Sequence, residues 1–448
     1  MSFQRFTLPN GLVVVCETIP YVRSVTVGIW VKTGSKYENA GEYGLTHFLE
    51  HLLFKGTQNR SAREIAEQMD AVGGQLNAFT SKEYTCFYAR VLSDHFAFAM
   101  ELLSDMLQNS VFAAEDFDRE KQVVLEEIKL YEDTPDELIH DLCAKSVLGD
   151  HPLGRPVLGS IESISAITRE QTIAFWREHY TADNLIISVA GQVDPEIVLH
   201  ETNRFFGAMT CHGTGTCCGN GTRAGCGAEA GTACEAGADV CCETGIDTGY
   251  GAGANLFKEK DTEQVHICLG SEGLSRRNEG RYAVQVLDAL LGGTVSSRLF
   301  QVLREERGLV YSAFSAHSAY QELGLFSIYV GVSKPNAGEV LKLLRQELLA
   351  VRQGQISEGE VSRAKEQLRG SILFGLESTS NRMSRLAKSE MFYGEIVPAD
   401  EIIARIQRVT KDDVIATARL VFARQPYISA IGQIAGLGRQ WAQFQKGW

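Results

Sequence analysis

The chain has 448 residues, of which 44% are hydrophobic and 22% are charged, and its formal net charge is −13. This length exceeds what one compact core organises and predicts two or more domains. The acidic balance argues against a nucleic-acid partner or an anionic membrane, because both are bound through basic surfaces. No window approaches the roughly 18 uninterrupted apolar residues of a membrane span. The early apolar run at 12–16 is too short for a secretory signal, so we expect a cytoplasmic protein.

The sequence repeats itself at an offset near 240 residues. The paired segments are 25–35 with 265–275, 47–53 with 285–291, and 167–193 with 409–434. Each pair shares its pattern of apolar residues, which is strand-like in the first pair, helical in the second and helix-then-strand in the third. The chain is therefore predicted to be a tandem duplication, with domains at 1–208 and 258–448 and a linker at 209–257.

Each half mixes strands with long amphipathic helices and lacks a regular strand–helix alternation, which is typical of an α+β fold. Helical spacing of apolar residues predicts helices at 61–73, 94–107 and 337–354. Ser61 is the expected N-cap of the first of these, and Glu64 completes a capping box. We therefore expect two tandemly duplicated α+β domains.

The segment GLTHFLEHLLFKG (44–56) carries the strongest chemical signal. On a helix, His47 and His51 project from one face and can bind the same metal ion, and Glu50 shares that side. Two imidazoles leave zinc under-coordinated, so a catalytic site needs a third protein ligand and an open position for water. Glu50 is then available to take a proton from that water.

A chance occurrence is the alternative explanation of this motif, and its frequency is roughly a few per cent for a chain of this composition. The duplication argues against chance. The paired positions in the second half are Gln285, Asp288 and Ala289, which cannot form the same site. The helix therefore does not need His47, Glu50 and His51 in order to fold.

The order H-x-x-E-H is the inverzincin signature. With this motif, the chain resembles the pitrilysin and mitochondrial-processing-peptidase family of zinc metallopeptidases over nearly everything except 209–255. The resemblance implies two tandem domains, each a mostly antiparallel sheet packed with helices. It also implies one Zn²⁺ per chain, with a glutamate about 76 residues beyond the second histidine as the third ligand, and that position is Glu127.

The family also has a companion glutamate seven residues before this ligand, which corresponds to Glu120 and would support the site from behind the ligands. Glu126 points about 100° away from Glu127 on a helix and is the weaker candidate ligand. For Glu120 and Glu127, the alternative is a solvated acidic helix face.

Two further matches to the family concern the substrate. The segment 73–91 resembles the substrate-binding edge strand, in which Asn77 and Ala78 would contact the peptide backbone by strand addition. An ordinary amphipathic strand is the alternative. Arg304 and Tyr311 resemble the family's substrate-binding pair, and both side chains are donors suited to a developing oxyanion. A charged cluster on a solvated helix is the alternative for Arg304.

The resemblance thus implies a zinc-dependent endopeptidase in which Glu50 acts as general base. A two-domain member is expected to form a homodimer that encloses a chamber for short or unfolded peptides, with Arg304 and Tyr311 of one protomer completing the zinc site of the other. A non-catalytic or partner-dependent subunit of a processing-peptidase-like complex is the alternative function. Intact candidate ligands and Glu50 argue against a subunit that has lost its zinc site.

Seven of the eleven cysteines lie at 211–242 in a background rich in Gly, Ala and Thr. Four of them recur every eight residues and no C-x-x-C pair occurs, which is a poor match to zinc-ligand spacing. A cysteine-based metal-binding module and a frameshifted interdomain linker both remain open. The remaining cysteines are predicted to be reduced and buried, and they are Cys16, Cys86, Cys143 and Cys268.

Overall fold

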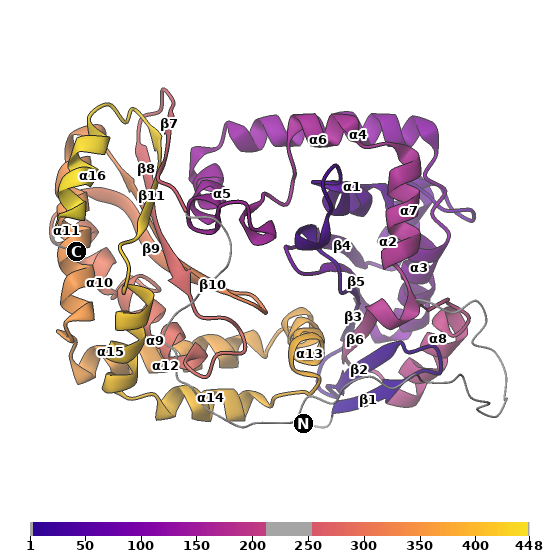
Figure 1. The fold of residues 1–448 in the computed structure, drawn as a ribbon. Coiled ribbons are helices and arrows are strands. Elements are labelled where there is room, and N and C mark those ends of the chain that lie inside the picture. The colour runs from indigo at the N-terminus through magenta and orange to yellow at the C-terminus, as the bar shows by residue number, and fades with distance from the viewer. Residues whose placement is uncertain (1–2, 212–252, 447) are drawn as a thin grey trace, which may run out of the picture.

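Two β-sheets, one in each half of the chain, organise the computed structural model, which describes residues 3–211, 253–446 and 448 (Figure 1). The strands of the first sheet are β1 (Phe3–Thr7), β2 (Val13–Thr18), β3 (Ser24–Val31), β4 (Gln75–Thr80), β5 (Thr85–Leu92) and β6 (Leu185–Gly191). The strands of the second sheet are β7 (Leu256–Glu259), β8 (Val265–Gly273), β9 (Val310–Ala319), β10 (Gly324–Val332) and β11 (Tyr427–Gly432).

The order of the strands repeats between the sheets. The first sheet runs β1-β2-β6-β3-β5-β4, and the second runs β7-β11-β8-β10-β9. The pairs β2–β6 and β7–β11 are parallel, and every other pair is antiparallel. The strands from β2 to β4 therefore have the same arrangement as those from β7 to β9, and the predicted pair of mostly antiparallel α+β domains is confirmed.

Helices surround both sheets. In the first half they are α1 (Leu45–Leu52), α2 (Ala62–Ala71), α3 (Phe96–Gln108), α4 (Ala114–Glu132), α5 (Pro135–Leu148), α6 (Ile161–Ala166), α7 (Arg169–His179) and α8 (Pro195–Phe206). In the second half they are α9 (Arg281–Leu291), α10 (Arg298–Phe300), α11 (Ala337–Arg352), α12 (Glu358–Gly375), α13 (Thr379–Tyr393), α14 (Ala399–Arg408), α15 (Lys411–Val421) and α16 (Leu437–Gln445).

The three helices predicted from apolar spacing are present as α2, α3 and α11. The capping box at α2 is also confirmed: Ser61 accepts a hydrogen bond from the Glu64 backbone, and Glu64 accepts one from the Ser61 backbone. The segment 73–91 folds differently from the single edge strand that the sequence indicated. A turn at Ser81–Tyr84 divides it into β4 and β5, and β4 alone lies at the edge.

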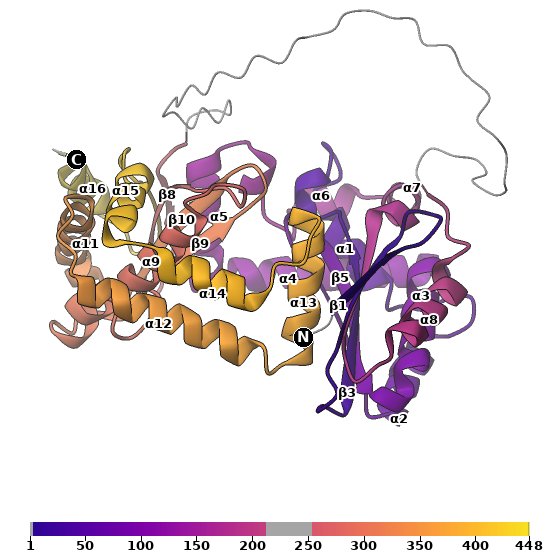
Figure 2. The ribbon, with the colours of Figure 1, turned by 90° about the horizontal axis from the view of Figure 1, so that it is seen from below.

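One helix of each half packs on the sheet of the other half (Figures 1 and 2). Helix α13 crosses β2, β3 and β6, where Met383 and Leu386 lie against Trp30. Helix α5 crosses β8 and β11, where Cys143 lies against Cys268. Both sheets are consequently covered on both faces, which explains why central strands such as β3 and β6 are buried along almost their whole length.

Ion pairs reinforce this exchange of helices. Arg382 of α13 pairs with Glu17 of β2, and both side chains are buried. At the tip of the β4–β5 hairpin, the buried Glu83 contacts Lys36 at 3.0 Å and Arg276 of the second half at 3.4 Å. The two halves are therefore joined by charged as well as apolar contacts.

The four scattered cysteines are buried and outside any disulfide, as predicted. Residues 212–252 of the predicted linker lie outside the described part of the chain. Both alternatives for this segment, a cysteine-based metal module and a frameshifted linker, therefore stay predictions. Among the helices of the described residues, none combines the length and the apolar character that crossing a membrane requires.

Candidate metal centre

Helix α1 presents the H-x-x-E-H motif, and a carboxylate from outside the helix caps its first turn. Residue Gly44 precedes the helix at φ 89°, where a side chain would be strained. The buried Glu38 accepts hydrogen bonds from the backbone N–H groups of Gly44 at 2.9 Å and Thr46 at 2.8 Å. These bonds satisfy donors that the helix itself cannot pair. Burial raises the pKa of Glu38 to about 7, although the two hydrogen bonds oppose that shift.

Glu38 could not be predicted from the sequence. Its distance from the helix start is longer than the three-residue spacing of a capping box, so no local pattern points to it. The apolar residues of α1 are buried in the core of the first half, and they are Leu45, Phe48, Leu49 and Leu52. This packing leaves His47 and His51 on the face that turns toward α4.

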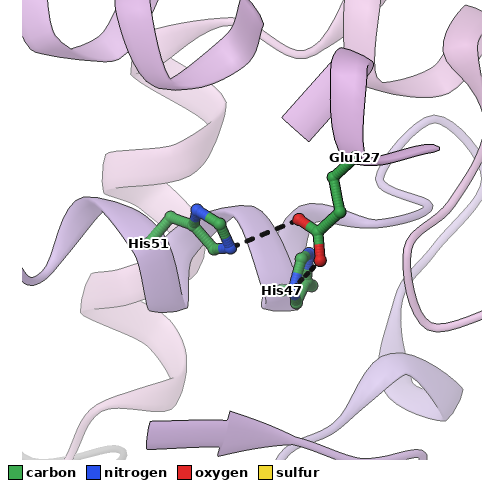
Figure 3. Close-up of side chains that lie close together, drawn as sticks. All are labelled: His47, His51 and Glu127. Atoms are coloured by element: carbon green, nitrogen blue, oxygen red, sulfur yellow. Dashed lines mark ion pairs between the residues drawn. The ribbon is translucent and has the colours of Figure 1, made fainter. Parts of the chain in front are cut away.

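Helix α4 supplies a carboxylate to that face (Figure 3). Val124 and Ile128 of α4 are buried in the same core, which directs Glu127 toward α1. The Nε2 atom of His47 lies 3.9 Å from Oε1 of Glu127, and Nε2 of His51 lies 3.6 Å from its Oε2. One ligand atom from each of the three residues lies within 4.8 Å of the others, and the described residues contain no other such group of His, Cys, Asp or Glu.

This donor set suits zinc. Burial, together with the nearby His51, lowers the pKa of His47 to about 4, so its imidazole is neutral and keeps a lone pair for a metal. The Oε2 atom of Glu127 is buried and has no hydrogen-bond partner among the described residues, although it faces His51. A cation between the two side chains would satisfy that oxygen. Two imidazole nitrogens and one carboxylate also form a common protein ligand set of catalytic zinc.

Glu50 lies beside these ligands. The Oγ1 atom of Thr80, at the end of β4, donates a hydrogen bond to Oε2 of Glu50. Burial raises the pKa of Glu50, and the bond from Thr80 acts in the opposite direction. The structure thus holds Glu50 at a fixed place near the histidines.

Glu120 is buried rather than solvated, with 5% of its side chain exposed. Its Oε2 atom lies 3.5 Å from Nδ1 of His51, on the side of the ring away from Glu127, and its Oε1 atom lies 2.9 Å from Nζ of Lys55. Glu126, by contrast, is exposed and pairs with Lys129. Glu120 and Glu127 therefore face the histidines, whereas Glu126 points away from them toward solvent, as expected from its position on the helix.

The predicted substrate strand lies next to the candidate metal centre, because β4 contacts α1. Asn77 is exposed and Ala78 is half-buried on this edge strand. The side chain of Asn77 accepts a hydrogen bond from the backbone N–H of Ala78 at 2.8 Å. The backbone N–H of Ala78 is thus occupied by a local side chain.

Arg304 and Tyr311 lie together, but in the second half. Arg304 belongs to a π-helical turn (Gln301–Glu305), a geometry that is frequent at functional sites, and Tyr311 is the second residue of β9. The guanidinium carbon lies 5.6 Å from the centre of the Tyr311 ring. Both side chains are exposed, Tyr311 by 73%. Within the described residues, no hydrogen bond or ion pair joins either one to the metal-centre residues.

Helix α9, which corresponds to α1 in the second half, makes a hydrogen bond to its edge strand like the one that α1 makes to β4. Ser315 of β9 donates a hydrogen bond to Asp288 of α9, as Thr80 does to Glu50. Burial raises the pKa of Asp288. The second copy thus retains a carboxylate bonded to its edge strand, although it has lost the metal-ligating side chains.

Comparison with known proteins gives these residues a family. Residues 13–161 match the family described as insulinase (peptidase family M16), and residues 166–368 match the peptidase M16 inactive domain. An uncharacterized zinc protease of Streptomyces coelicolor is 42% identical and covers 97% of this chain and 90% of its own length. The uncharacterized zinc protease YmxG of Bacillus subtilis is 38% identical over 96% of this chain and 98% of its own.

Solved structures share the fold. A protease from Helicobacter pylori has a TM-score of 0.82 and 22% identity, covering 96% of this chain and 99% of that one. A peptidase M16 inactive domain from Pseudomonas fluorescens also has a TM-score of 0.82, with 20% identity over 96% of this chain and 98% of that one. The resemblance inferred from the sequence is therefore confirmed, and the chain belongs to the pitrilysin-type family M16 of zinc peptidases.

Proposed function

We propose that the protein is a zinc-dependent endopeptidase that hydrolyses short or unfolded peptides. The observation that carries the proposal is the convergence of His47, His51 and Glu127 from two helices, with Glu50 beside them. These three side chains would hold one Zn²⁺, which supplies a water whose pKa is lowered to about 7.

Glu50 is the general base of this proposal. Its carboxylate takes a proton from the attacking water and later delivers one to the leaving amine. The hydrogen bond from Thr80 leaves the second oxygen of Glu50 for this proton transfer. Because Thr80 terminates the edge strand β4, it links the position of the base to the strand proposed to bind substrate.

An extended peptide binds by adding a strand to β4. Edge strands carry unpaired backbone groups that recognise peptide backbone irrespective of sequence. In this chain the peptide displaces the Asn77 side chain from the N–H of Ala78 and takes over that donor. Folded proteins lack such an extended segment, which is why the proposed substrates are short or unfolded.

Arg304 and Tyr311 complete the site in a homodimer. Their side chains are donors that suit a peptide backbone and the oxyanion of a tetrahedral intermediate. Both are exposed and lie beside each other in the second half, so they are available to the metal centre of another protomer. Two protomers arranged in this way would enclose a chamber around the sites.

Dependence on a different gene product is the second candidate function. The description of the second matched family as inactive fits a division of labour between domains or subunits. The presence of both the metal-centre residues and Arg304 with Tyr311 in one chain favours a protein that is active by itself.

Zinc content and cleavage of a fluorogenic peptide, measured on the same purified samples, test the proposal. We expect Glu50→Gln to keep stoichiometric zinc and to lose at least about a thousandfold in kcat, because the base is removed and the ligands stay. Glu127→Gln should lose zinc and activity together. Glu126→Gln, one residue away on the exposed side of α4, is the matched control and should lose neither.

Two results would contradict the proposal. Zinc that remains bound after both histidines are replaced would move the metal elsewhere, and full activity of Glu50→Gln would remove the general base. An inactive wild-type protein that nevertheless binds zinc through His47 and His51 would favour the partner-dependent alternative.

A further inference from the structure

Lys55 has no part in the chemistry proposed above, yet an ion pair joins it to the metal centre. It lies just beyond the end of α1, one helical turn after His51. Its Nζ atom is 2.9 Å from Oε1 of Glu120, whose other oxygen, Oε2, is 3.5 Å from Nδ1 of His51. The three side chains thus form a chain of contacts that ends on a proposed metal ligand.

We propose that Lys55 is a positioning residue of the metal centre, which holds one oxygen of Glu120 and thereby turns the other oxygen toward His51. The inference rests on the proposed zinc site and concerns how that site is kept in shape. Lys55 contacts neither metal nor substrate in this proposal and acts only through Glu120.

The burial of Glu120 is the first argument. A carboxylate that is 5% exposed has little contact with water and needs charged or hydrogen-bonding partners within the protein. Lys55 is the lysine or arginine that pairs with it in the described structure. Because the ammonium group fixes Oε1, the carboxylate has one orientation, and Oε2 is the oxygen that faces the histidine.

The second argument is that the two histidines differ in burial and in the neighbour at Nδ1. The Nδ1 atom of His47 has no hydrogen-bond partner among the described residues, but the ring is only 12% exposed and packing restrains it. His51 is twice as exposed, at 25%, so packing restrains it less. The negative charge of Glu120, 3.5 Å from Nδ1 of His51, favours the proton on that nitrogen and leaves the lone pair on Nε2, the atom that faces Glu127.

The positive charge of Lys55, acting through space, would change zinc affinity in the opposite direction to the positioning effect. Removing a positive charge from the neighbourhood of a divalent cation favours cation binding. If Lys55 acted only through its charge, Lys55→Met would bind zinc more tightly than the wild type. If it acts by positioning Glu120, the variant binds zinc more weakly. The direction of the change therefore separates the two effects.

The test is the dissociation constant for zinc, measured by competition with a chromogenic chelator and without any peptide substrate. Loss of an outer partner of a zinc ligand typically weakens binding about 10–100-fold, and we expect a change of this size in Lys55→Met. Lys55→Arg keeps a donor and a charge and should stay within about threefold of the wild type. Lys129→Met is the control, because it breaks an exposed lysine–glutamate pair on the same helix as Glu120.

A double-mutant cycle with Glu120→Ala completes the test. In the Glu120→Ala background, Lys55→Met should have no further effect on zinc affinity. Unchanged or tighter binding in Lys55→Met, or an equal loss with and without Glu120, would overturn the inference. If His47→Ala binds zinc as well as the wild type does, the proposed zinc site itself is wrong. This variant therefore distinguishes failure of the zinc site from failure of the role proposed for Lys55.

Discussion

At the scale of single residues, the metal-bearing helix depends on a buried carboxylate outside its motif. Glu38 accepts two hydrogen bonds from the first turn of α1, and a negative charge there also interacts favourably with the helix dipole. Burial nevertheless raises the pKa of Glu38 from 4.5 to about 7. The stabilising contacts and the cost of burying the charge therefore compete in the physiological pH range.

This competition predicts a pH-dependent stability. Because the pKa of Glu38 is higher in the folded protein, the folded state binds more protons between the two pKa values, and the contribution of Glu38 to stability falls as the pH rises from about 4.5 to about 7. Glu38→Gln lacks this titration. The melting temperature of the wild type, relative to that of the variant, should therefore be higher at about pH 5.5 than at about pH 8. A constant difference across this range would contradict the assignment.

The duplicated contact between helix and edge strand allows a second prediction. Thr80 bonds to Glu50 in the first half, and Ser315 bonds to Asp288 in the second. A hydrogen bond to a charged group contributes about 1.5–3 kcal/mol. Thr80→Val should therefore lower kcat for a peptide about tenfold or more, with little change in KM, because the base is no longer held.

Ser315→Ala supplies the matched control, because it removes the equivalent bond where no base is proposed. It should lower the melting temperature about as much as Thr80→Val does and leave kcat unchanged. If both variants reduce kcat equally, the bond from Thr80 serves the fold rather than the position of Glu50.

At the scale of elements, the exchange of α5 and α13 determines how the halves are joined. Helix α13 brings the buried Arg382 against the buried Glu17 of β2. Removing one member of a buried pair leaves the other charge without compensation and costs about 3–5 kcal/mol. Arg382→Met should therefore lower the melting temperature by several degrees.

Two variants test whether burial of this pair is decisive. Replacing Arg382 and Glu17 together by apolar residues should restore most of the loss, since no charge then stays buried. Lys260 of the second half pairs with Asp133 of the first, but the Asp133 side chain is 78% exposed, so Lys260→Met should cost much less. Equal losses in Arg382→Met and Lys260→Met would show that burial of the pair is not decisive.

Features with a local pattern could be predicted from the sequence, and features made by distant contacts could not. The helix of His47 and His51 and the capping box of α2 follow from spacings of three and four residues. The duplicated sheets follow from the repeated apolar patterns. Nothing local distinguishes α13, whose apolar residues pack on a sheet formed by residues more than 180 positions earlier.

The same limit applies to the candidate site. Glu127 was found through a family spacing, whereas Glu38 and Lys55 act through contacts with α1 and α4 that no motif records. The predicted edge strand, 73–91, contains β4 but is too long, because the turn at Ser81–Tyr84 lacks the glycine and proline that would mark it in the sequence. These features depend on contacts between residues that are distant in the sequence or on a turn without its usual residues, so residue types alone do not reveal them.

At the scale of the whole molecule, the proposed chemistry is divided between the halves. The metal-centre residues come from α1 and α4 of the first half (Figures 1 and 2), whereas Arg304 lies in the π-helical turn and Tyr311 in β9 of the second half. The exchanged helices fasten the halves to each other, so bringing the exposed pair to the metal centre of the same chain would require these contacts to change. Bringing it to the metal centre of another protomer would not.

A mixing experiment tests this division. In a homodimer with shared sites, Glu50→Gln and Arg304→Ala protomers are each inactive alone, but every mixed dimer contains one intact site, formed by Glu50 of one protomer and Arg304 of the other. With equal amounts and random pairing, half of the dimers are mixed, so about a quarter of the wild-type sites is restored. Activity should rise to this level after co-expression, and crosslinking with mass analysis should report a dimer. If each chain forms its own complete site, the mixture has only the mean activity of the two variants, because no combination of protomers then unites the two functional groups.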